Sequence, residues 1–187
     1  KTEMVEAAVK ATMERFGRVD ILVNNAGTGA VGPAEEITDD QFRHEMNIDL
    51  FGTFVCAREF GKEMIKAQYG RIISIASMYG LVGNMIVGSA PYHAAKGGVV
   101  NFTRALAAEW GKYGITVNSI CPGYFYTDLT TETLDSDYFQ AIAKRSIPLE
   151  RYGRSGELDT CALFLASPAS TYVTGQNIAV DGGYTCV

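Results

Sequence analysis

The sequence predicts an α/β fold in which helices cover both faces of a parallel sheet. Stretches with helical spacing alternate along the chain with short apolar runs at 19–23, 71–76, 115–120 and 177–180. Strands that are apolar on both faces are typical of parallel sheets covered on both sides. The 187 residues, 47% hydrophobic and 20% charged, are sufficient for one globular domain with a sizeable core.

The first elements are a helix and a strand. Residues 2–16 carry apolar side chains at helical spacing and end at Gly17, which predicts an amphipathic helix. The run 19–23 predicts a buried strand, which ends in Asn-Asn-Ala-Gly at 24–27. Because the chain begins at Lys1, inside this helix, we expect it to be the C-terminal portion of a longer protein.

The glycines after this strand spell a nucleotide-binding pattern, but their context argues against it. Gly27, Gly29 and Gly32 have the G-x-G-x-x-G spacing, which is a dinucleotide fingerprint only where it opens a helix. Here Pro33 intervenes, and the next helix signal comes at Thr38. We therefore expect a loop.

A long helix and a second strand follow. Thr38 and Gln41 form a capping-box pattern, which predicts a helix over residues 39 to about 68. Gly52 marks a bend or a close approach within this helix. The apolar run 71–76 predicts the second buried strand.

The rest of the chain continues this alternation of helix and strand, through the segments 91–110, 115–120, 156–166 and 177–180. A polar and aromatic segment, 124–154, separates the third strand from the last helix. We expect it to hold a short helix around 138–145 and to form a lid over the site.

Polar residues and glycines gather at the expected carboxyl ends of the strands. Asn24–Gly27 follow the first strand, Ser77 follows the second, and Pro122 and Gly123 follow the third. Open parallel sheets bind ligands at this edge. We therefore expect these residues to form one site.

A tyrosine and a lysine stand at the start of the helix that leads away from this edge. Tyr92 and Lys96 are four residues apart and share one helix face, and Pro91 suits the first turn. A nearby ammonium stabilises a phenolate, so Lys96 is expected to lower the pKa of Tyr92. A tyrosine tuned in this way serves as an acid or a base near neutral pH.

The composition argues against several classes of function. A net charge of −5 argues against a nucleic-acid-binding surface, and no apolar run approaches the roughly 20 residues of a membrane span. With only two histidines, we expect no metal site. The widely spaced cysteines predict free thiols in a reducing compartment, the cytoplasm: Cys56, Cys121, Cys161 and Cys186.

Taken together, the motifs resemble those of the short-chain dehydrogenase/reductase family. They are Asn-Asn-Ala-Gly at 24–27, Ser77, Tyr92-x-x-x-Lys96 and Pro122-Gly123-x-x-x-Thr127, in this order. The resemblance covers essentially the whole chain, and the set is far more specific than any one motif. It implies a Rossmann-like, doubly wound parallel sheet of seven strands, of which residues 1–187 supply the fourth to the seventh as a single domain. The first three strands and the phosphate-binding loop have no counterpart here.

The resemblance also implies a role for each matched residue. Tyr92 would be the general acid/base, Lys96 would lower its pKa and bind the nicotinamide ribose, and Ser77 would hydrogen-bond the reacting oxygen. The cofactor would be NAD or NADP, which carries the hydride. Its binding residues, besides Tyr92 and Lys96, would be Asn24, Ala26, Gly27, Pro122, Gly123 and Thr127.

Two departures from the family pattern stand near the site. The family has an asparagine in an Asn-Leu-x-Gly frame as a fourth catalytic member, acting largely through its backbone carbonyl. The same frame here is Asp-Leu-Phe-Gly at 49–52, so Asp49 takes that position although Asn47 lies close by. The Ser77–Tyr92 spacing is also longer than usual, which enlarges the loop 83–89.

These features, with the stretch 124–129, are most similar to the branch that acts on polyols and sugar acids, such as gluconate 5-dehydrogenase. The substrate would then be a small alcohol or ketone. The alternative within the family is a 3-oxoacyl-[acyl-carrier-protein] reductase, which shares all the motifs. A basic surface for the acidic carrier protein would favour that alternative, and the acidic balance of the chain disfavours it.

A hypothesis of another class is an inactive, truncated fragment that oligomerises without binding cofactor. The strand at 19–23 would then form an exposed hydrophobic edge, and we expect such a fragment to aggregate or to fail to bind NAD(P)H. The resemblance implies that the 39–68 helix and the Tyr92 helix form the subunit interface of a homodimer or homotetramer.

Other notable residues have ordinary structural explanations beside functional ones. His93 faces away from the tyrosine on the helix, and Cys121 is expected to be a small buried apolar residue. The aromatic residues 124–126 either line a sugar-sized pocket or pack the lid. Arg151 and Arg154 either bind an acidic substrate or belong to an ordinary polar segment.

Overall fold

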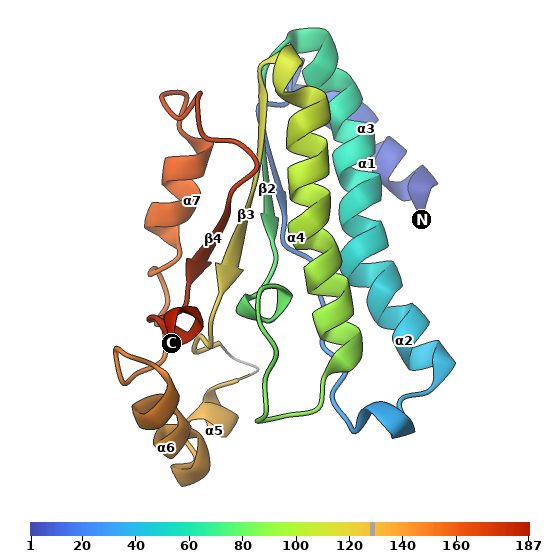
Figure 1. The fold of residues 1–187 in the computed structure, drawn as a ribbon. Coiled ribbons are helices and arrows are strands. Elements are labelled where there is room, and N and C mark those ends of the chain that lie inside the picture. Colours follow the sequence, from blue (N-terminus) through green and yellow to red (C-terminus); the bar gives the residue numbers. More distant parts are fainter. Residues whose placement is uncertain (128–129) are drawn as a thin grey trace.

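A four-stranded parallel sheet forms the centre of the computed structural model, which describes residues 1–127 and 130–187 (Figure 1). The strands are adjacent in chain order, and every neighbouring pair is parallel. They are β1 (Ile21–Asn24), β2 (Gly70–Ile75), β3 (Ile115–Pro122) and β4 (Asn177–Val180). The predicted parallel α/β architecture is confirmed.

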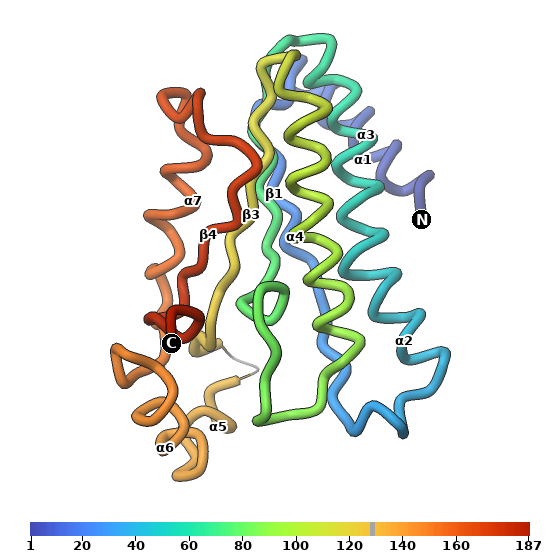
Figure 2. Tube along the Cα trace, in the orientation of Figure 1, coloured from blue at the N-terminus to red at the C-terminus, as the bar shows by residue number. Residues whose placement is uncertain are grey.

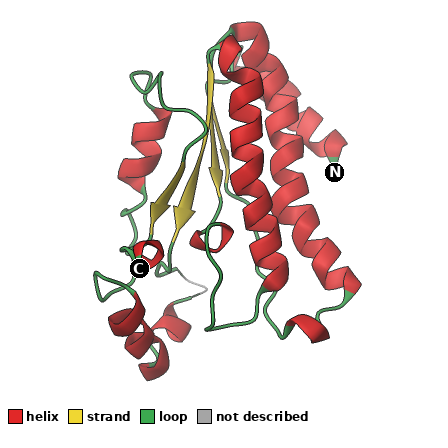
Figure 3. Ribbon diagram, viewed as in Figure 1, coloured by secondary structure: helices red, strands yellow, loops and turns green. Residues whose placement is uncertain are grey.

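Helices cover both faces of this sheet (Figure 3). On one face α3 (Gly52–Ala67) and α4 (Ala90–Trp110) lie side by side, and on the other lies α7 (Asp159–Ala166) (Figure 1). Each interface has its own apolar core. Met64, Leu106 and Val117 are buried on the α3 and α4 side, and Ile73 and Leu165 are buried on the α7 side.

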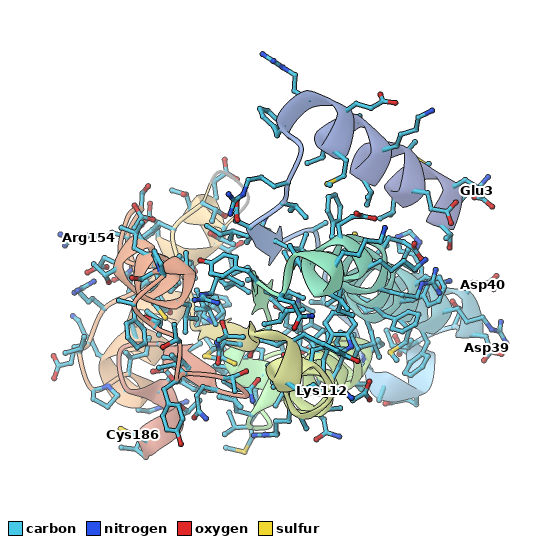
Figure 4. All side chains as sticks on the ribbon, turned by 90° about the horizontal axis from the view of Figure 1, so that it is seen from above. Glu3, Asp39, Asp40, Lys112, Arg154 and Cys186 are labelled. Atoms are coloured by element: carbon cyan, nitrogen blue, oxygen red, sulfur yellow. The ribbon has the colours of Figure 1, made fainter. Side chains whose placement is uncertain are left out.

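The N-terminal edge of the fold is largely exposed. Helix α1 (Thr2–Phe16) contributes no buried residue, and Figure 4 shows it apart from the main body, with Glu3 at its outer end. Strand β1 is the outer strand of the described sheet, where Ile21 and Val23 are 46% and 51% exposed. The expected exposed apolar edge is therefore observed among the described residues.

The predicted long helix contains a break in its regular geometry. The capping box of Thr38 and Gln41 is present and starts α2 (Asp39–Glu45). A π-helical segment, Met46–Phe51, follows, and α3 begins after it. The expectation of one continuous α-helix over 39–68 is wrong here, because the π-helical turn adds a residue where Asp49 faces the interior.

The remaining elements surround the carboxyl ends of the strands. The glycine run 27–32 continues as a loop to a short 3₁₀ turn, Ala34–Glu36, as expected from the sequence. It lies beside the loop 83–89, where Gly32 N donates to Gly88 O at 2.8 Å (Figure 2). A second 3₁₀ turn, Met78–Gly80, follows β2.

The segment after β3 folds into two short helices at the same end of the sheet (Figure 1). They are α5 (Thr131–Leu134), which was not predicted, and α6 (Asp137–Ser146), which matches the helix predicted around 138–145. Asp128 and Leu129, part of the stretch compared with the polyol and sugar-acid branch, lie outside the described residues. Among the helices described, none has the length and apolarity needed to cross a membrane.

Candidate active site

A cavity of about 750 Å³ opens at the carboxyl ends of β1, β2 and β3. Its walls come from the loops that follow these strands, the first turns of α4, and the segment with α5 and α6. This is the edge where the sequence placed its polar residues and glycines. Six of the predicted residues line the cavity: Gly27, Ser77, Tyr92, Lys96, Pro122 and Gly123.

Ser77 and Tyr92 reach the cavity from two rigid elements. Ser77 follows β2 by two residues and is buried, and its Oγ accepts a hydrogen bond from Tyr79 N at 3.1 Å, which starts the 3₁₀ turn. Tyr92 lies on the first turn of α4, which Pro91 begins. Both side chains line the cavity.

The pKa of Tyr92 is shifted in the direction opposite to the one expected from the sequence. Burial raises the pKa of Tyr92, the Ser77 hydrogen bond lowers it, and the charges of Asp49 and Glu45 raise it further. The net direction is upward. The expected lowering of this pKa is wrong for this arrangement, because burial has the largest effect and the charges of Asp49 and Glu45 act in the same direction.

Lys96 is held by two oxygen atoms behind Tyr92. Its Nζ lies 3.0 Å from Asp49 Oδ2, in an ion pair whose side chains are almost fully buried, and it donates to Ile75 O at 3.0 Å. The Asp49 Oδ2 contact lacks hydrogen-bond geometry, so it is a contact of charges. The ammonium also lies 5.5 Å from the centre of the Tyr92 ring.

Asp49 connects this ion pair to the glycine loop. It is 1% exposed, and its Oδ1 accepts a hydrogen bond from Thr28 N at 2.8 Å. Its backbone carbonyl accepts from Thr53 Oγ1, also at 2.8 Å. Asn47, the neighbouring asparagine, is exposed. Asp49 therefore acts on the site through its side chain, beyond the backbone role that the resemblance implied.

Glu45 is a second buried carboxylate, which the sequence analysis missed. It is 1% exposed, and Oε2 accepts a hydrogen bond from Ala30 N at 2.9 Å. Oε1 is buried without a hydrogen-bond partner among the described residues. Burial, and then the charge of Asp49, raise the pKa of Glu45. The four-residue spacing from Asp49 was the available signal, because it puts both side chains on one helix face.

Gly27 is required where the loop passes over the ion pair. A Cβ built at this position would lie 3.2 Å from Lys96 Nζ and 3.3 Å from Asp49 Oδ2. Any side chain would therefore press on both charged groups. The glycine allows the backbone to approach the bottom of the cavity.

Three predicted cofactor-binding residues lie away from the described cavity lining. Asn24 is buried in the sheet, where its Nδ2 donates to Ser74 Oγ at 3.3 Å. Ala26 is exposed, and Thr127 is exposed with its Oγ1 2.9 Å from Thr130 Oγ1. Five residues with amide or aliphatic hydroxyl side chains that were not predicted line the cavity instead: Asn25, Thr28, Ser89, Thr130 and Thr133.

Another part of the cavity wall is aromatic. Tyr79 Oη and Tyr124 Oη lie 2.6 Å apart, and Tyr124 packs edge-on against Phe139. Burial raises the pKa of both tyrosines of this pair. Of the residues 124–126, Tyr124 lines the cavity and Tyr126 packs inside the lid against Tyr152. Tyr79 was missed, because the turn that positions it has no signature in the sequence.

The enlarged loop 83–89 is held by a polar cluster around His93. The ring stacks on Tyr79, and its Nδ1 donates to Ser89 O at 2.9 Å. Asn84 Nδ2 donates to the other ring nitrogen at 3.3 Å, and Asn84 Oδ1 accepts from Ile86 N and Val87 N. This pattern fits a neutral imidazole with its proton on Nδ1. His93 therefore has the structural role that was expected.

The two arginines considered for an acidic substrate lie elsewhere. Arg151 binds Glu157 through two hydrogen bonds, at 2.7 and 2.8 Å, on the surface. Arg154 projects from the periphery in Figure 4. Neither belongs to the described lining of the main cavity. Cys121 is fully buried and packs with Ala76, as expected for a small apolar residue.

Comparison with known proteins agrees with this geometry. The model of a family described as Enoyl-(Acyl carrier protein) reductase matches residues 1–185. A 3-oxoacyl-[acyl-carrier-protein] reductase of Synechocystis sp. is 39% identical over 180 residues, which are 96% of this chain and 70% of that protein. Galactitol 2-dehydrogenase (L-tagatose-forming) of Cereibacter sphaeroides is 40% identical over 178 residues, 95% of this chain and 70% of that enzyme.

The solved structures include a gluconate 5-dehydrogenase from Burkholderia cenocepacia in complex with NADP and tartrate. It is 37% identical to this chain with a TM-score of 0.94, and the match covers 100% of this chain and 72% of that one.

Proposed function

The chain belongs to the short-chain dehydrogenase/reductase family, and from this premise we propose that it interconverts a secondary alcohol and a ketone with NAD or NADP. The observation that carries the proposal is that Ser77, which follows β2, meets Tyr92 and Lys96 of α4 at one cavity. A phenol, a hydroxyl and an ammonium around one cavity suit proton exchange at a carbonyl or alcohol oxygen.

In this proposal each side chain has a distinct task. Tyr92 gives a proton to the carbonyl oxygen during reduction and removes it from the hydroxyl during oxidation. Ser77 donates a hydrogen bond to the same oxygen and stabilises the charge that develops on it. The ion pair of Lys96 and Asp49 sets the electrostatic environment of the phenol.

The cavity suits a nicotinamide nucleotide on two observations. Its volume of about 750 Å³ lies within the usual range for ligand pockets. At Gly27 no side chain stands between the loop and Lys96 Nζ, which the ribose would contact. Lys96 and Tyr92 would hold the ribose, and Pro122 and Gly123 the carboxamide side. When bound, the cofactor supplies or accepts the hydride.

The substrate that we propose is a polyhydroxylated compound, as in the branch that acts on polyols and sugar acids. Two relatives support this branch, one named as a galactitol dehydrogenase and one as a gluconate 5-dehydrogenase. The hydroxyls of Tyr79 and Tyr124 offer a donor and an acceptor inside the cavity. They suit hydroxyl groups on a substrate.

Within this branch, the lining favours a neutral polyol over a sugar acid. Lys96 is the one cation of the described cavity lining, and Asp49 already pairs with it. The two residues outside the described part, Asp128 and Leu129, bring no positive charge. A bound carboxylate would therefore lack a free cationic partner, which is costly in a buried site.

An assay panel tests the proposal. Purified protein is offered NAD⁺ or NADP⁺ with galactitol, with gluconate, and with uncharged four-carbon polyols, and NAD(P)H with acetoacetyl thioester. We expect the highest kcat/KM with a neutral polyol and a loss of activity in Tyr92→Phe. Turnover of gluconate alone would overturn the choice of a neutral substrate, and turnover of the thioester alone would overturn the branch.

A second candidate is 3-oxoacyl-[acyl-carrier-protein] reductase activity. The observation in its favour is the 39% identity to a Synechocystis protein of that name. The acidic net charge of −5 stands against a docking surface for an acidic carrier protein. The thioester arm of the assay separates the two candidates.

We also propose that residues 1–187 act as one domain that assembles with further copies of itself through the face formed by α3 and α4. Phe51 and Phe54 support this, because they are 51% and 37% exposed and contact each other there. Phe54 also packs edge-on against Phe102 of α4. Light scattering of the protein and of Phe54→Glu tests the assembly, and an unchanged mass would contradict it.

A further inference from the structure

Glu45 has no place in the proposed reaction, yet it is buried beside its machinery. It ends α2, immediately before the π-helical segment that carries Asp49. Its carboxyl is held against the glycine loop by Ala30 N, as that of Asp49 is held by Thr28 N. The two carboxylates therefore support one short stretch of loop from below.

The charges of this cluster do not balance if both carboxyls are ionised. Glu45, Asp49 and Lys96 would carry two negative charges and one positive charge. Asp49 and Ile75 O hold the Lys96 ammonium, and no described cation lies within ion-pair distance of Glu45. A buried and unpaired carboxylate is so costly that such groups usually take up a proton instead.

The hydrogen bonds of Glu45 agree with a neutral carboxyl. Oε2 accepts one N–H group, whereas Oε1 is buried and accepts none from the described residues. An ionised carboxylate is acceptor-only and needs donors at both oxygens. A protonated carboxyl carries no charge, so an oxygen without a partner costs it less than it costs a carboxylate.

We propose that Glu45 is a protonated carboxylic acid at neutral pH, and that it is a positioning residue that acts through Tyr92. With one proton on Glu45, the cluster with Asp49 and Lys96 is electrically neutral. The groups whose charges bear on Glu45 are Asp49 on the π-helical segment, Lys96 on α4 and His44 on α2, and the charge of Glu45 in turn reaches Tyr92. When Glu45 ionises at higher pH, its charge opposes formation of the Tyr92 phenolate.

Infrared spectroscopy tests the protonation state without substrate or cofactor. Wild-type protein at neutral pH is compared with Glu45→Gln, and with Glu36→Gln as a control at an exposed position. We expect a protonated-carboxyl band that only Glu45→Gln removes. In unmutated protein this band shifts with ¹³C-labelled glutamate and not with ¹³C-labelled aspartate. No such band, or a shift with aspartate, would overturn the proposal.

The pH dependence of stability gives a second readout. The pKa of Glu45 is raised in the folded state above its ordinary value of 4.5. A raised carboxyl pKa contributes stability that is present below the unfolded value and is lost as the pH rises through the folded value. Relative to the wild type, Glu45→Gln should therefore gain in unfolding midpoint as the pH rises from 4 to 8. A difference in unfolding midpoint between the two proteins that stays constant from pH 4 to pH 8 would overturn the proposal.

The link to Tyr92 is the only part that rests on the proposed function. The tyrosinate absorbance of Tyr92 is titrated with pH in the wild type and in Glu45→Gln. In each case the titration of the matching protein that also carries Tyr92→Phe is subtracted, which leaves the signal of Tyr92. We expect Glu45→Gln to shift this titration to lower pH, because it removes a negative charge that the alkaline wild type carries. An unmoved titration would refute the effect on Tyr92. Failure of the alcohol assays would leave all three of these measurements unaffected.

Discussion

The two walls of the cavity are built in different ways. The polar wall consists of Ser77, which follows β2, and of Tyr92 and Lys96 on α4, and Asp49 of the π-helical segment supports it from behind through its ion pair with Lys96. The aromatic wall consists of Tyr79, Tyr124, Leu134 and Phe139, which lie in a 3₁₀ turn and in the segment that follows β3. The first wall is fixed by regular elements, and the second by contacts between loops and short helices.

This difference separates chemistry from recognition. Charged and hydrogen-bonded groups on rigid elements keep the reacting oxygen in one place. Aromatic side chains on variable segments define the space around the rest of the substrate. Changes in the polar wall should therefore act on kcat and on folding, whereas changes in the aromatic wall should act on KM.

Tyr92→Phe should have the largest effect of any single change. It removes the one hydroxyl that exchanges a proton in the proposed reaction, so kcat should fall by about 10²–10⁴-fold. Tyr172→Phe is the matched control, since that side chain is fully exposed. Circular dichroism of both variants should match the wild type. Retained turnover in Tyr92→Phe would remove the phenol from the mechanism.

Lys96→Met should cause the largest loss of stability. It leaves the Asp49 carboxylate buried without its cation, and breaking a buried pair from one side costs about 3–5 kcal/mol. The free energy of unfolding in urea measures this loss. The double variant Lys96→Met/Asp49→Asn should recover part of it, because no charge is then left unpaired. If the double variant loses as much unfolding free energy as the two single variants together, the two groups are not coupled.

The sequence predicted the polar wall better than the aromatic wall, for identifiable reasons. Tyr92 and Lys96 lie in a regular helix, where a four-residue spacing fixes a common face, and Ser77 comes just after a strand. Glu45 was missed because a glutamate in a polar helix is ordinarily solvated. The π-helical turn that brings Asp49 to Lys96 leaves no pattern of its own.

The aromatic wall lacked such regularity. Tyr124 was predicted only as a candidate, since a short segment after a strand has no fixed direction. Tyr79 depends on a hydrogen bond from its own backbone to Ser77 and on stacking with His93. Neither contact follows from spacing along the chain. Likewise, Asn24 follows the expected strand but points into the sheet toward Ser74.

Tyr79→Phe and Tyr124→Phe should each act mainly on KM. Each change leaves the partner hydroxyl without its 2.6 Å contact, at a cost of about 1 kcal/mol, so KM should rise by about fivefold. The double variant should lose less free energy than the two single variants together, because neither ring then carries a hydroxyl that lacks its partner. Steady-state kinetics on the best polyol measures all three. A loss confined to kcat would place this pair in the chemistry instead.

Asn84→Ala should have a smaller effect, through the loop 83–89. The change removes the bonds to Ile86 N and Val87 N and the donor to His93, and Val87 lines the cavity. We expect a rise of a few-fold in KM, consistent with about 1 kcal/mol, with kcat unchanged. Asn84→Asp keeps the acceptor for the two backbone groups and should restore most of the affinity. If Asn84→Ala and Asn84→Asp raise KM equally, the rise comes from the loss of the His93 contact alone.

Glu157→Gln should produce the smallest effect, and its pH dependence has the opposite sign to that of Glu45→Gln. The hydrogen bonds from Arg151 and then from Arg154 N lower the pKa of the exposed Glu157 to about 2, from an ordinary value of 4.5. A lowered carboxyl pKa contributes stability that is present above 4.5 and lost as the pH falls toward 2. Thermal unfolding across this range should show a small wild-type advantage near neutral pH that disappears in acid. Added salt should weaken this advantage, because the pair faces solvent. An advantage that persists in acid, or one that salt leaves unchanged, would show that the contribution of Glu157 does not come from its charge.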